Sequence, residues 1–362
     1  METNHNSPRR LPGVIAKLLL LSISVSLGVG AVEVALRVLV AAAPEVMPID
    51  FVADPELQSL PKIQGMTALK RPNQHATFNG KFYRTNSRGV RGPEYEVPKP
   101  SSVFRTVIVG DSFTMGSGVD EEDTYSARLQ RRLDANDSNH KHEVVNLGVG
   151  GFSMSASVAR LRFQGIRLQP DLVVYGWTYN DIESYVYRKT SSPIAPAVTD
   201  LLFEKIARDR IAAVRDMFYP ATDSYVTELD QNYFRNDAAW KIFTEGLDNF
   251  ALIAHSQRVC AVMLLHTGLY SLHRFHPFQR FYDVVAEAAE ERGIHVARTF
   301  DRYKGLEPES MWIHPTDSHP NAEGHRILAD ALGETIEALP AGCLKTDQQE
   351  SPEPSDTTTL RR

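Results

Sequence analysis

The chain has 362 residues, of which 42% are hydrophobic, and a formal net charge of −6. This length can form one large domain or two small ones, and the mild negative charge gives no global attraction to nucleic acid. Two cysteines occur, Cys260 and Cys343. They lack the spacing of metal ligands, and Cys343 falls in a polar tail, so a disulfide between them is possible but not favoured.

The N-terminus combines basic residues with an apolar run. Arg9, Arg10 and Lys17 precede an uncharged segment from Leu18 to Val32. A helix needs about 20 residues to cross a bilayer, and the segment reaches that length from Leu11 if the Lys17 ammonium extends to the interface. Positive charges before the run predict a cytoplasmic N-terminus and an exported remainder.

We expect residues 1–43 to form a basic tip and an uncleaved signal-anchor transmembrane helix. A cleavable secretory signal is the alternative, because small residues at 28–30 or 41–43 suit a signal peptidase. The first case predicts a single-pass membrane protein with its main domain in the periplasm or outside the cell. The second case predicts a secreted protein.

Three further regions follow. Residues 44–102 are rich in proline and are predicted to form a loop-rich lead-in, with short extended pieces at 76–78 and 81–83, that packs on the main domain. The main domain is predicted over 103–340. The polar residues 341–362 are predicted to be a disordered tail.

Strands and helices alternate through the main domain. Strands are predicted at 105–109, 144–147, 171–175, 258–265 and 294–297. Helices are predicted at 124–133, 153–168, 200–217, 237–255, 277–292 and 321–339. The alternation predicts an α/β fold with three α/β/α layers, built on a flavodoxin-like five-stranded parallel sheet and preceded by the N-terminal transmembrane helix.

Polar and glycine-rich blocks follow these strands. They are Gly110-Asp111-Ser112-Phe113 after the first strand, Gly148-Val149-Gly150-Gly151 after the second, Thr178-Tyr179-Asn180-Asp181 after the third and Asp317-Ser318-His319 beyond the fifth. Ligands of open parallel sheets bind at the carboxyl ends of the strands. We therefore expect these blocks to converge on one edge of the sheet.

The residue types suit acyl transfer. The Ser112 hydroxyl needs a base to become a nucleophile, and His319 has suitable basicity near neutral pH. The Asp317 carboxylate can fix the tautomer of the imidazole. The backbone N–H groups of Ser112 and Gly151 and the Asn180 side-chain amide can donate to a developing oxyanion.

The four blocks resemble the SGNH hydrolases, also called GDSL-type esterases and lipases, over about residues 103–339. The resemblance implies a catalytic triad of Ser112, Asp317 and His319. It implies an oxyanion hole of Ser112, Gly151 and Asn180, without a metal or organic cofactor. Residues 82–92 also resemble a segment preceding this domain in bacterial membrane-anchored members, and some relatives act on acyl groups of exported polysaccharides.

The chain departs from the family pattern at two positions. Thr178 stands where the family usually has a glycine two residues before the asparagine. Only Ser318 separates Asp317 from His319, where the family usually has two residues. This shorter spacing resembles that in some polysaccharide O-acetyltransferase relatives, and it keeps acyl transfer open beside hydrolysis.

Several other residues have competing interpretations. The loop after the fourth strand carries three histidines without accompanying carboxylates, so we expect them to line the cleft or lie at the surface rather than bind a metal: His266, His273 and His276. Trp177 and Tyr179 flank Asn180 and either wall the pocket or pack in the core. His314 is close to His319 in the sequence and is expected either to support the site without touching the substrate or to lie in a loop.

These observations predict an exported serine hydrolase that cleaves ester bonds, with short O-acyl or acetyl groups favoured, through an acyl-serine intermediate. The expected partners are an ester-bearing small molecule or glycan and, through the N-terminal helix, a membrane. One alternative is an O-acyltransferase that uses the same site to modify an exported polysaccharide. A second is a non-catalytic glycan-binding protein.

Overall fold

The computed structural model describes residues 11–42, 72–73, 75–78, 81–138, 140–182, 222–272, 276–315 and 317–344. The helix predicted at 200–217 and the histidine at position 273 lie outside these residues. Helix α1 spans Leu11–Ala42, the segment in which a transmembrane helix was predicted. Within the described part of the chain, no helix has the length and apolar character needed to cross a membrane.

A five-stranded parallel sheet forms the centre of the domain. Its strands are β3 (Val103–Gly110), β4 (Lys141–Asn146), β5 (Leu172–Trp177), β6 (Cys260–Leu265) and β7 (His295–Arg298). The spatial order is β4-β3-β5-β6-β7. Numbered along the chain this is 2-1-3-4-5, the flavodoxin-like order, so the predicted sheet is confirmed.

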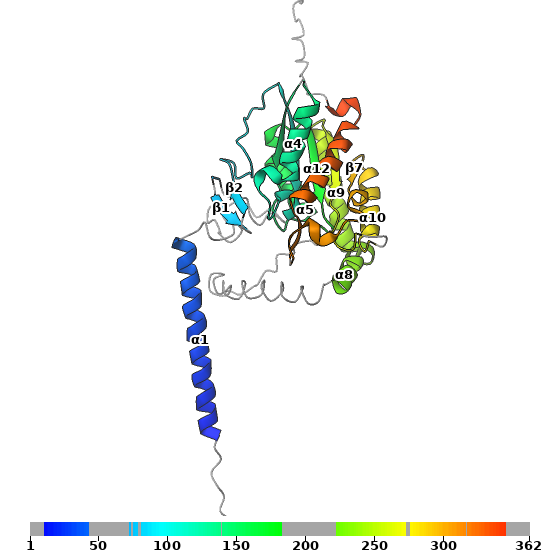
Figure 1. The fold of residues 1–362 in the computed structure, drawn as a ribbon. Coiled ribbons are helices and arrows are strands. Elements are labelled where there is room, and N and C mark those ends of the chain that lie inside the picture. Colours follow the sequence, from blue (N-terminus) through cyan, green and yellow to red (C-terminus); the bar gives the residue numbers. More distant parts are fainter. Residues whose placement is uncertain are drawn as a thin grey trace, which may run out of the picture.

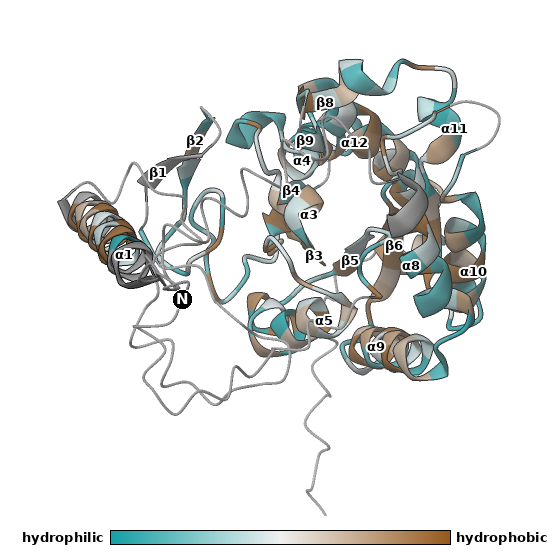
Figure 2. Ribbon diagram, turned by 90° about the horizontal axis from the view of Figure 1, so that it is seen from below, coloured by the Kyte–Doolittle hydropathy of each residue, from teal (hydrophilic) through white to brown (hydrophobic). Residues whose placement is uncertain are grey.

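Helices cover both faces of the sheet, as predicted. One face packs against α5 (Met154–Phe163), α8 (Thr222–Phe234), α9 (Asp237–Ser256) and α10 (Gln279–Glu290). The other face packs against α4 (Tyr125–Asn136) and α12 (Ala322–Glu337). Figure 2 shows the strands between α5 and α9 on one side and α4 and α12 on the other. Alternate residues of β3, such as Val107 and Ile108, enter opposite cores because side chains alternate along a strand.

Short elements surround this frame. They are the antiparallel pair β1 (His75–Phe78) and β2 (Lys81–Arg84), helix α3 (Ser112–Met115), η3 (Glu121–Asp123), η4 (Gly165–Leu168), α11 (Phe300–Tyr303), η5 (Pro308–Met311), the antiparallel pair β8 (Trp312–His314) and β9 (Asp317–Pro320), and η6 (Ala341–Leu344). In Figure 1 the β1–β2 pair is coloured cyan, and α4 and α12 lie side by side.

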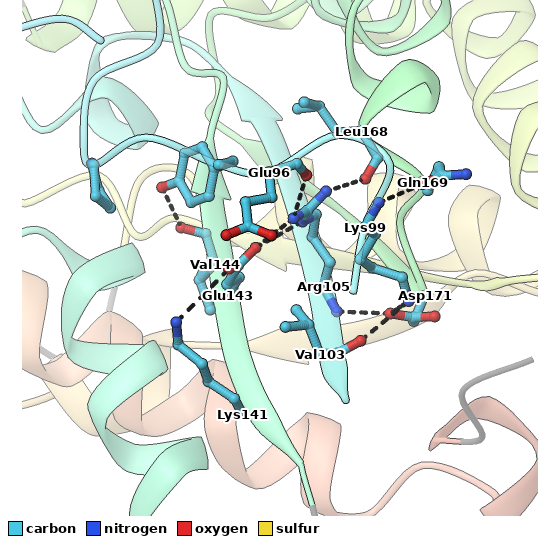
Figure 3. Close-up of polar contacts among 12 residues, drawn as sticks. Glu96, Lys99, Val103, Arg105, Lys141, Glu143, Val144, Leu168, Gln169 and Asp171 are labelled. Carbon is cyan, nitrogen blue, oxygen red and sulfur yellow. Dashed lines mark hydrogen bonds and ion pairs between the residues drawn. The ribbon is translucent and has the colours of Figure 1, made fainter. Parts of the chain in front are cut away.

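The end of the lead-in is tied to the start of the sheet by a buried ionic network (Figure 3). Arg105 on β3 is fully buried and donates from Nε and Nη2 to Glu143 of β4 at 2.9 and 2.5 Å. Arg105 also donates to the Glu96 carbonyl at 2.9 Å, and Lys99 pairs with Asp171 before β5. These contacts hold residues 96–99, at the end of the lead-in, on the main domain at the amino-terminal ends of the strands.

The structure corrects the interpretation of the two cysteines. Cys260 at the start of β6 and Cys343 in η6 form a disulfide. Sequence spacing did not indicate it because 83 positions separate the two residues. Helix α12 returns the chain along the sheet, and η6 then places Cys343, which is buried, beside the start of β6. Residues 341–344 thus remain attached to the domain.

Candidate active site

The first strand leads directly into the nucleophile turn. Ser112 is the first residue of α3, and Asp111 caps this helix by accepting a hydrogen bond from the Phe113 N–H at 2.9 Å. A Cβ at Gly110 would lie 2.6 Å from the Gly176 carbonyl oxygen, so only glycine allows β3 to end this close to β5. The sharp strand-to-helix turn places Ser112 at the carboxyl end of the sheet.

His319 lies between Ser112 and Asp317, within hydrogen-bond distance of both. The His319 Nε2 atom is 2.8 Å from Ser112 Oγ, and its Nδ1 atom is 2.5 Å from Asp317 Oδ1. Asp317 and His319 are both on β9. Residues two apart on a strand point to the same side, which explains how a single intervening residue suffices. The hydroxyl of that residue, Ser318, is instead 2.5 Å from the Tyr270 hydroxyl.

The electrostatics of the pair suit a general base with an ionised partner. Burial acts to lower the pKa of His319, but the hydrogen bond and the charge of Asp317 outweigh it and hold the pKa above the ordinary 6.5. Burial acts to raise the pKa of Asp317, but its bonds to His319 leave the pKa below 3.8. Asp317 therefore remains ionised while His319 exchanges a proton.

The glycine-rich block after β4 packs on the nucleophile helix. Asn146 donates from Nδ2 to the Thr114 carbonyl at 2.6 Å and accepts from the Gly148 N–H at 2.9 Å. A Cβ at Gly148 would lie 2.3 Å from the Met115 nitrogen, so the backbones are in close contact. Gly151, at the end of this block, has a φ of +77°. No hydrogen bond joins Gly151 to Ser112 among the described residues, and its role as an oxyanion donor stays a prediction.

The block after β5 forms a compact polar turn. The Asp181 carboxylate accepts from the Thr178 N–H at 2.9 Å and from the Tyr175 hydroxyl at 2.6 Å. Asn180 contacts Thr178 through its side-chain oxygen, at 2.5 Å from Thr178 Oγ1. Asp111 lies on the other side of Thr178, with Oδ2 at 2.9 Å from the same hydroxyl. Sequence reasoning assigned no role to Asp111 or Thr178, although a threonine in place of glycine was a visible signal.

This arrangement can be compared with known proteins. The model of the GDSL-like lipase/acylhydrolase family matches residues 108–327. The chain belongs to the GDSL-like lipase/acylhydrolase family. Membership confirms the resemblance to SGNH hydrolases and makes the chain a hydrolase acting on esters. No curated protein matches the chain.

Solved structures similar to this GDSL-family chain include three enzymes. An alpha/beta hydrolase from the metagenome of Lake Arreo, Spain, is 19% identical and has a TM-score of 0.43, covering 67% of this chain and 96% of the other. The acetyl xylan esterase AlAXEase is 14% identical at a TM-score of 0.42, covering 64% and 100%. A catalytic mutant of an acetylxylan esterase from Geobacillus stearothermophilus is 19% identical at a TM-score of 0.41, covering 64% and 94%.

Two histidines predicted near the cleft or the surface of this GDSL-family chain are core residues instead, so that expectation was wrong for them. His266 is fully buried, stacked on Phe113 at 5.5 Å and edge-on to Tyr125 at 5.4 Å. Burial lowers the pKa of His266 to about 3, so its ring is neutral. His276 is also buried, and its Nε2 atom lies 2.9 Å from the Gly268 carbonyl oxygen.

Among the described residues, one group has potential ligand atoms close enough together to bind a metal ion. It consists of Cys260, His295 and Cys343. Two of its three members are joined as a disulfide, so their thiolates are not free for a metal. The group lies at the start of β6 and β7, at the edge opposite Ser112.

The remaining sequence candidates of this GDSL-family chain differ in how deeply their side chains are buried. Trp177 is fully buried and packs edge-on against Tyr282 at 5.6 Å, so it belongs to the core. Tyr179 is half-buried and stacks on Phe278 with ring centroids 4.4 Å apart. His314 lies on strand β8 rather than in a loop, and its side chain is exposed.

A lead-in residue outside the matched family region supports the nucleophile helix. Arg91 is buried and donates to the carbonyls of Met115, Gly116 and Val119 at 2.8, 2.6 and 2.6 Å. These carbonyls lie at the end of α3 and just after it, where helix carbonyls lack helical partners. Arg91 therefore connects the lead-in to the segment that carries Ser112. The sequence indicated the segment around it but not this role.

Proposed function

We propose that the chain is an exported serine esterase that hydrolyses short O-acyl esters, those of glycans included, through an acyl-Ser112 intermediate. One observation carries the proposal. In a member of the GDSL family, the Ser112 hydroxyl, the His319 imidazole and the Asp317 carboxylate form a continuous hydrogen-bonded chain. This is the arrangement by which a base activates a hydroxyl nucleophile.

The proposed reaction has two halves. His319 takes the proton of Ser112 as Oγ attacks the ester carbonyl, and the oxyanion receives hydrogen bonds from the Ser112 and Gly151 N–H groups and the Asn180 amide. His319 then protonates the departing alcohol, which leaves acyl-Ser112. In the second half His319 deprotonates a water that attacks the acyl group, and the carboxylic acid leaves as the proton returns to Ser112. Asp317 stays ionised throughout and steadies the imidazolium.

Substitution of the nucleophile tests this proposal. Ser112→Ala is expected to reduce hydrolysis of p-nitrophenyl acetate by the full-length protein to the background rate and to abolish labelling by a fluorophosphonate probe. The matched control is Ser256→Ala, because Ser256 is exposed at the end of α9. Turnover or labelling that persists without Ser112 refutes the assignment. Absence of labelling in the native protein would instead support the non-catalytic glycan-binding alternative.

O-acyl transfer to a glycan hydroxyl is a second candidate function. The spacing of Asp317 and His319, held on β9, favours it through its resemblance to polysaccharide O-acetyltransferases. Both reactions share the acyl-Ser112 step and differ in the acceptor that resolves it. Product analysis with an acetyl donor and a polysaccharide acceptor separates them. Acetylated polysaccharide indicates transfer, and acetate alone indicates hydrolysis.

The proposed location is outside the cytoplasm, with the N-terminal segment as a membrane anchor. The basic residues before the apolar run support this orientation. The Cys260–Cys343 disulfide supports it as well, because structural disulfides persist mainly in oxidising compartments. Protease treatment of spheroplasts tests the proposal. Degradation of the full-length protein from outside, with retention of an N-terminal fragment in the membrane fraction, is the expected result.

A further inference from the structure

The Thr178 hydroxyl lies among more acceptors than one proton can serve. Its Oγ1 atom is 2.5 Å from Asn180 Oδ1, 2.9 Å from Asp111 Oδ2 and 3.4 Å from Asp181 Oδ1. A hydroxyl donates one hydrogen, whereas an ionised carboxylate and an amide oxygen donate none. At least one of the two short contacts therefore needs a hydrogen from the partner residue.

Two hydrogen arrangements satisfy both contacts. In the first, Asp111 is a carboxylic acid that donates from Oδ2 to Thr178, and Thr178 donates to Asn180 Oδ1. In the second, the Asn180 amide is turned by 180°, so that its nitrogen donates to Thr178 and Thr178 donates to an ionised Asp111. The two arrangements share the same heavy-atom positions, because amide oxygen and nitrogen are nearly interchangeable in size.

The chemistry proposed for the site distinguishes them. The first arrangement engages the Asn180 oxygen and leaves its Nδ2 available as a donor to the oxyanion. The second arrangement leaves the amide oxygen in that place, where it would repel the developing negative charge. Resting on the proposed serine esterase function, we propose that Asp111 is a neutral carboxylic acid that, through the Thr178 hydroxyl, holds the Asn180 amide with its nitrogen toward the oxyanion.

The surroundings of Asp111 favour its neutral form. Asp111 is 2% exposed, and this burial raises the pKa of its carboxyl above the ordinary value despite hydrogen bonds that favour the ion. The titratable groups that interact with it are Asp181, His319, Tyr125 and Tyr175, and Tyr175 also donates to Asp181. Of these only protonated His319 favours an ionised Asp111, and His319 must be neutral to act as the base. Asp181 is buried as well, and burial together with the charge of Asp111 raises the pKa of its carboxyl well above the ordinary value, so the two neighbouring carboxyls oppose each other's ionisation.

The contacts of Asp111 and Asp181 differ in the oxygen atom that they engage. The Asp181 Oδ2 atom accepts two hydrogen bonds, from Tyr175 and from the Thr178 N–H, which favour its ionised form against the burial that raises its pKa. The Phe113 N–H donates to Asp111 Oδ1, and the Thr114 N–H also bonds this carboxyl, while Oδ2 faces the Thr178 hydroxyl and can carry a proton toward it. The relay depends on a hydroxyl at position 178. A glycine, which the family usually has there, offers none.

Substitutions at three positions test the relay in the full-length protein, with p-nitrophenyl acetate turnover as the readout. Thr178→Val removes the hydroxyl at nearly constant volume and is expected to lower kcat at least tenfold with little change in KM. Thr178→Ser is expected to restore most of kcat. Asn180→Ala removes the oxyanion donor, which typically costs about 10²–10³ in kcat. In the Asn180→Ala background, Thr178→Val is expected to cost no more than about twofold, because its effect passes through Asn180.

Asp111 is tested by a neutral mimic. In Asp111→Asn the amide oxygen can accept from Phe113 while its nitrogen donates to Thr178, so this variant is expected to lose far less kcat than Asp111→Ala. Ionisation of Asp111 at high pH turns the Thr178 hydroxyl away from Asn180. An alkaline decline of kcat that Asp111→Asn lacks is therefore expected in the native protein.

Each failure has a distinct signature. If Thr178→Val costs the same factor with and without Asn180, or if Asp111→Asn loses as much as Asp111→Ala, the relay is refuted while the esterase assignment stands. If turnover and fluorophosphonate labelling do not depend on Ser112, the assignment and the relay fall together. Circular dichroism melts of each variant separate misfolding from misorientation, and a Thr178→Val variant that unfolds is replaced by Thr178→Ala in the same cycle.

Discussion

At the scale of single residues, Asp317 and His319 determine when the site is active. Two residues apart on β9, they share a contact at 2.5 Å that keeps the pKa of His319 above 6.5 even though burial acts to lower it. The base must be neutral to accept the Ser112 proton. Activity in kcat/KM should therefore rise with pH through the pKa of His319, with a midpoint above 6.5 in the native protein.

Removal of the Asp317 charge is expected to move this midpoint. In Asp317→Asn the charge that raises the pKa of His319 is gone, while burial still lowers it. The pKa of His319 therefore falls, and the acid limb of the kcat/KM profile shifts to lower pH. The wrong tautomer is favoured at the same time, and kcat should fall by up to about 10⁴-fold. A pH profile of kcat/KM measures both effects. Ser318→Ala serves as the control, because it removes no charge, and an unshifted midpoint in Asp317→Asn would refute the electrostatic coupling.

The sequence predicted the reacting residues more completely than it predicted the contacts that position them. Ser112 and His319 stand in short motifs, and the structure brings them to 2.8 Å. The relay through Thr178 joins residues 111, 178 and 180, and no local pattern shows that a strand pairing places them together. His266 looked like a cleft residue because it follows a strand end, yet its side chain turns inward beneath Phe113. Side-chain direction after a strand is set by tertiary packing, which a single sequence does not display.

At the scale of elements, the nucleophile helix α3 has four residues, too few to be stable alone. Its position depends on what surrounds it, and Arg91 supplies three hydrogen bonds to the carbonyls of Met115, Gly116 and Val119. Arg91→Lys cannot reproduce the planar fork and is expected to lower kcat about tenfold or more by shifting Ser112 from His319, because misplacement by about 1 Å costs roughly 10²-fold.

The Arg91 prediction has a stability component and a matched control. Arg91→Ala leaves three buried carbonyls without this partner, and each bond to a charged donor is worth about 1.5–3 kcal/mol. Urea unfolding measures the loss, and p-nitrophenyl acetate kinetics measure the displacement of Ser112. Arg88→Ala is the control, because Arg88 is exposed in the same segment. Native kinetics in a folded Arg91→Lys protein would show that the lead-in does not position the nucleophile.

Element boundaries were predictable where apolar runs are continuous. Strands β3 and β5 are buried at every position, and both were predicted within a few residues. The hairpin of β8 and β9 was not predicted, because its strands have three and four residues with half-exposed side chains and no clear alternation. Helix α8 was missed as well. Its aromatic residues, such as Tyr233, pack on neighbouring aromatic rings rather than repeating at a clear helical period.

At the scale of the whole molecule, flanking segments of the chain are attached to the domain at both ends of the sheet's strands. The lead-in is held by Arg105 and Lys99 at the start of the strands and by Arg91 beside the nucleophile at their ends. The C-terminal segment returns to the start of β6 through Cys343. The family match covers residues 108–327, so these attachments come from parts of the chain on either side of the matched region.

Truncation at two neighbouring points tests the C-terminal attachment. A chain ending after Leu344 keeps η6 and the disulfide, whereas a chain ending after Pro340 loses Cys343. Loss of a native disulfide typically costs about 2–5 kcal/mol, because the unfolded chain is no longer cross-linked. The shorter chain should therefore melt several degrees lower under oxidising conditions, and a reductant should abolish most of the difference. Equal melting temperatures without reductant would show that the Cys260–Cys343 bond does not stabilise the domain. A difference that persists in reductant would assign the effect to the packing of η6 instead.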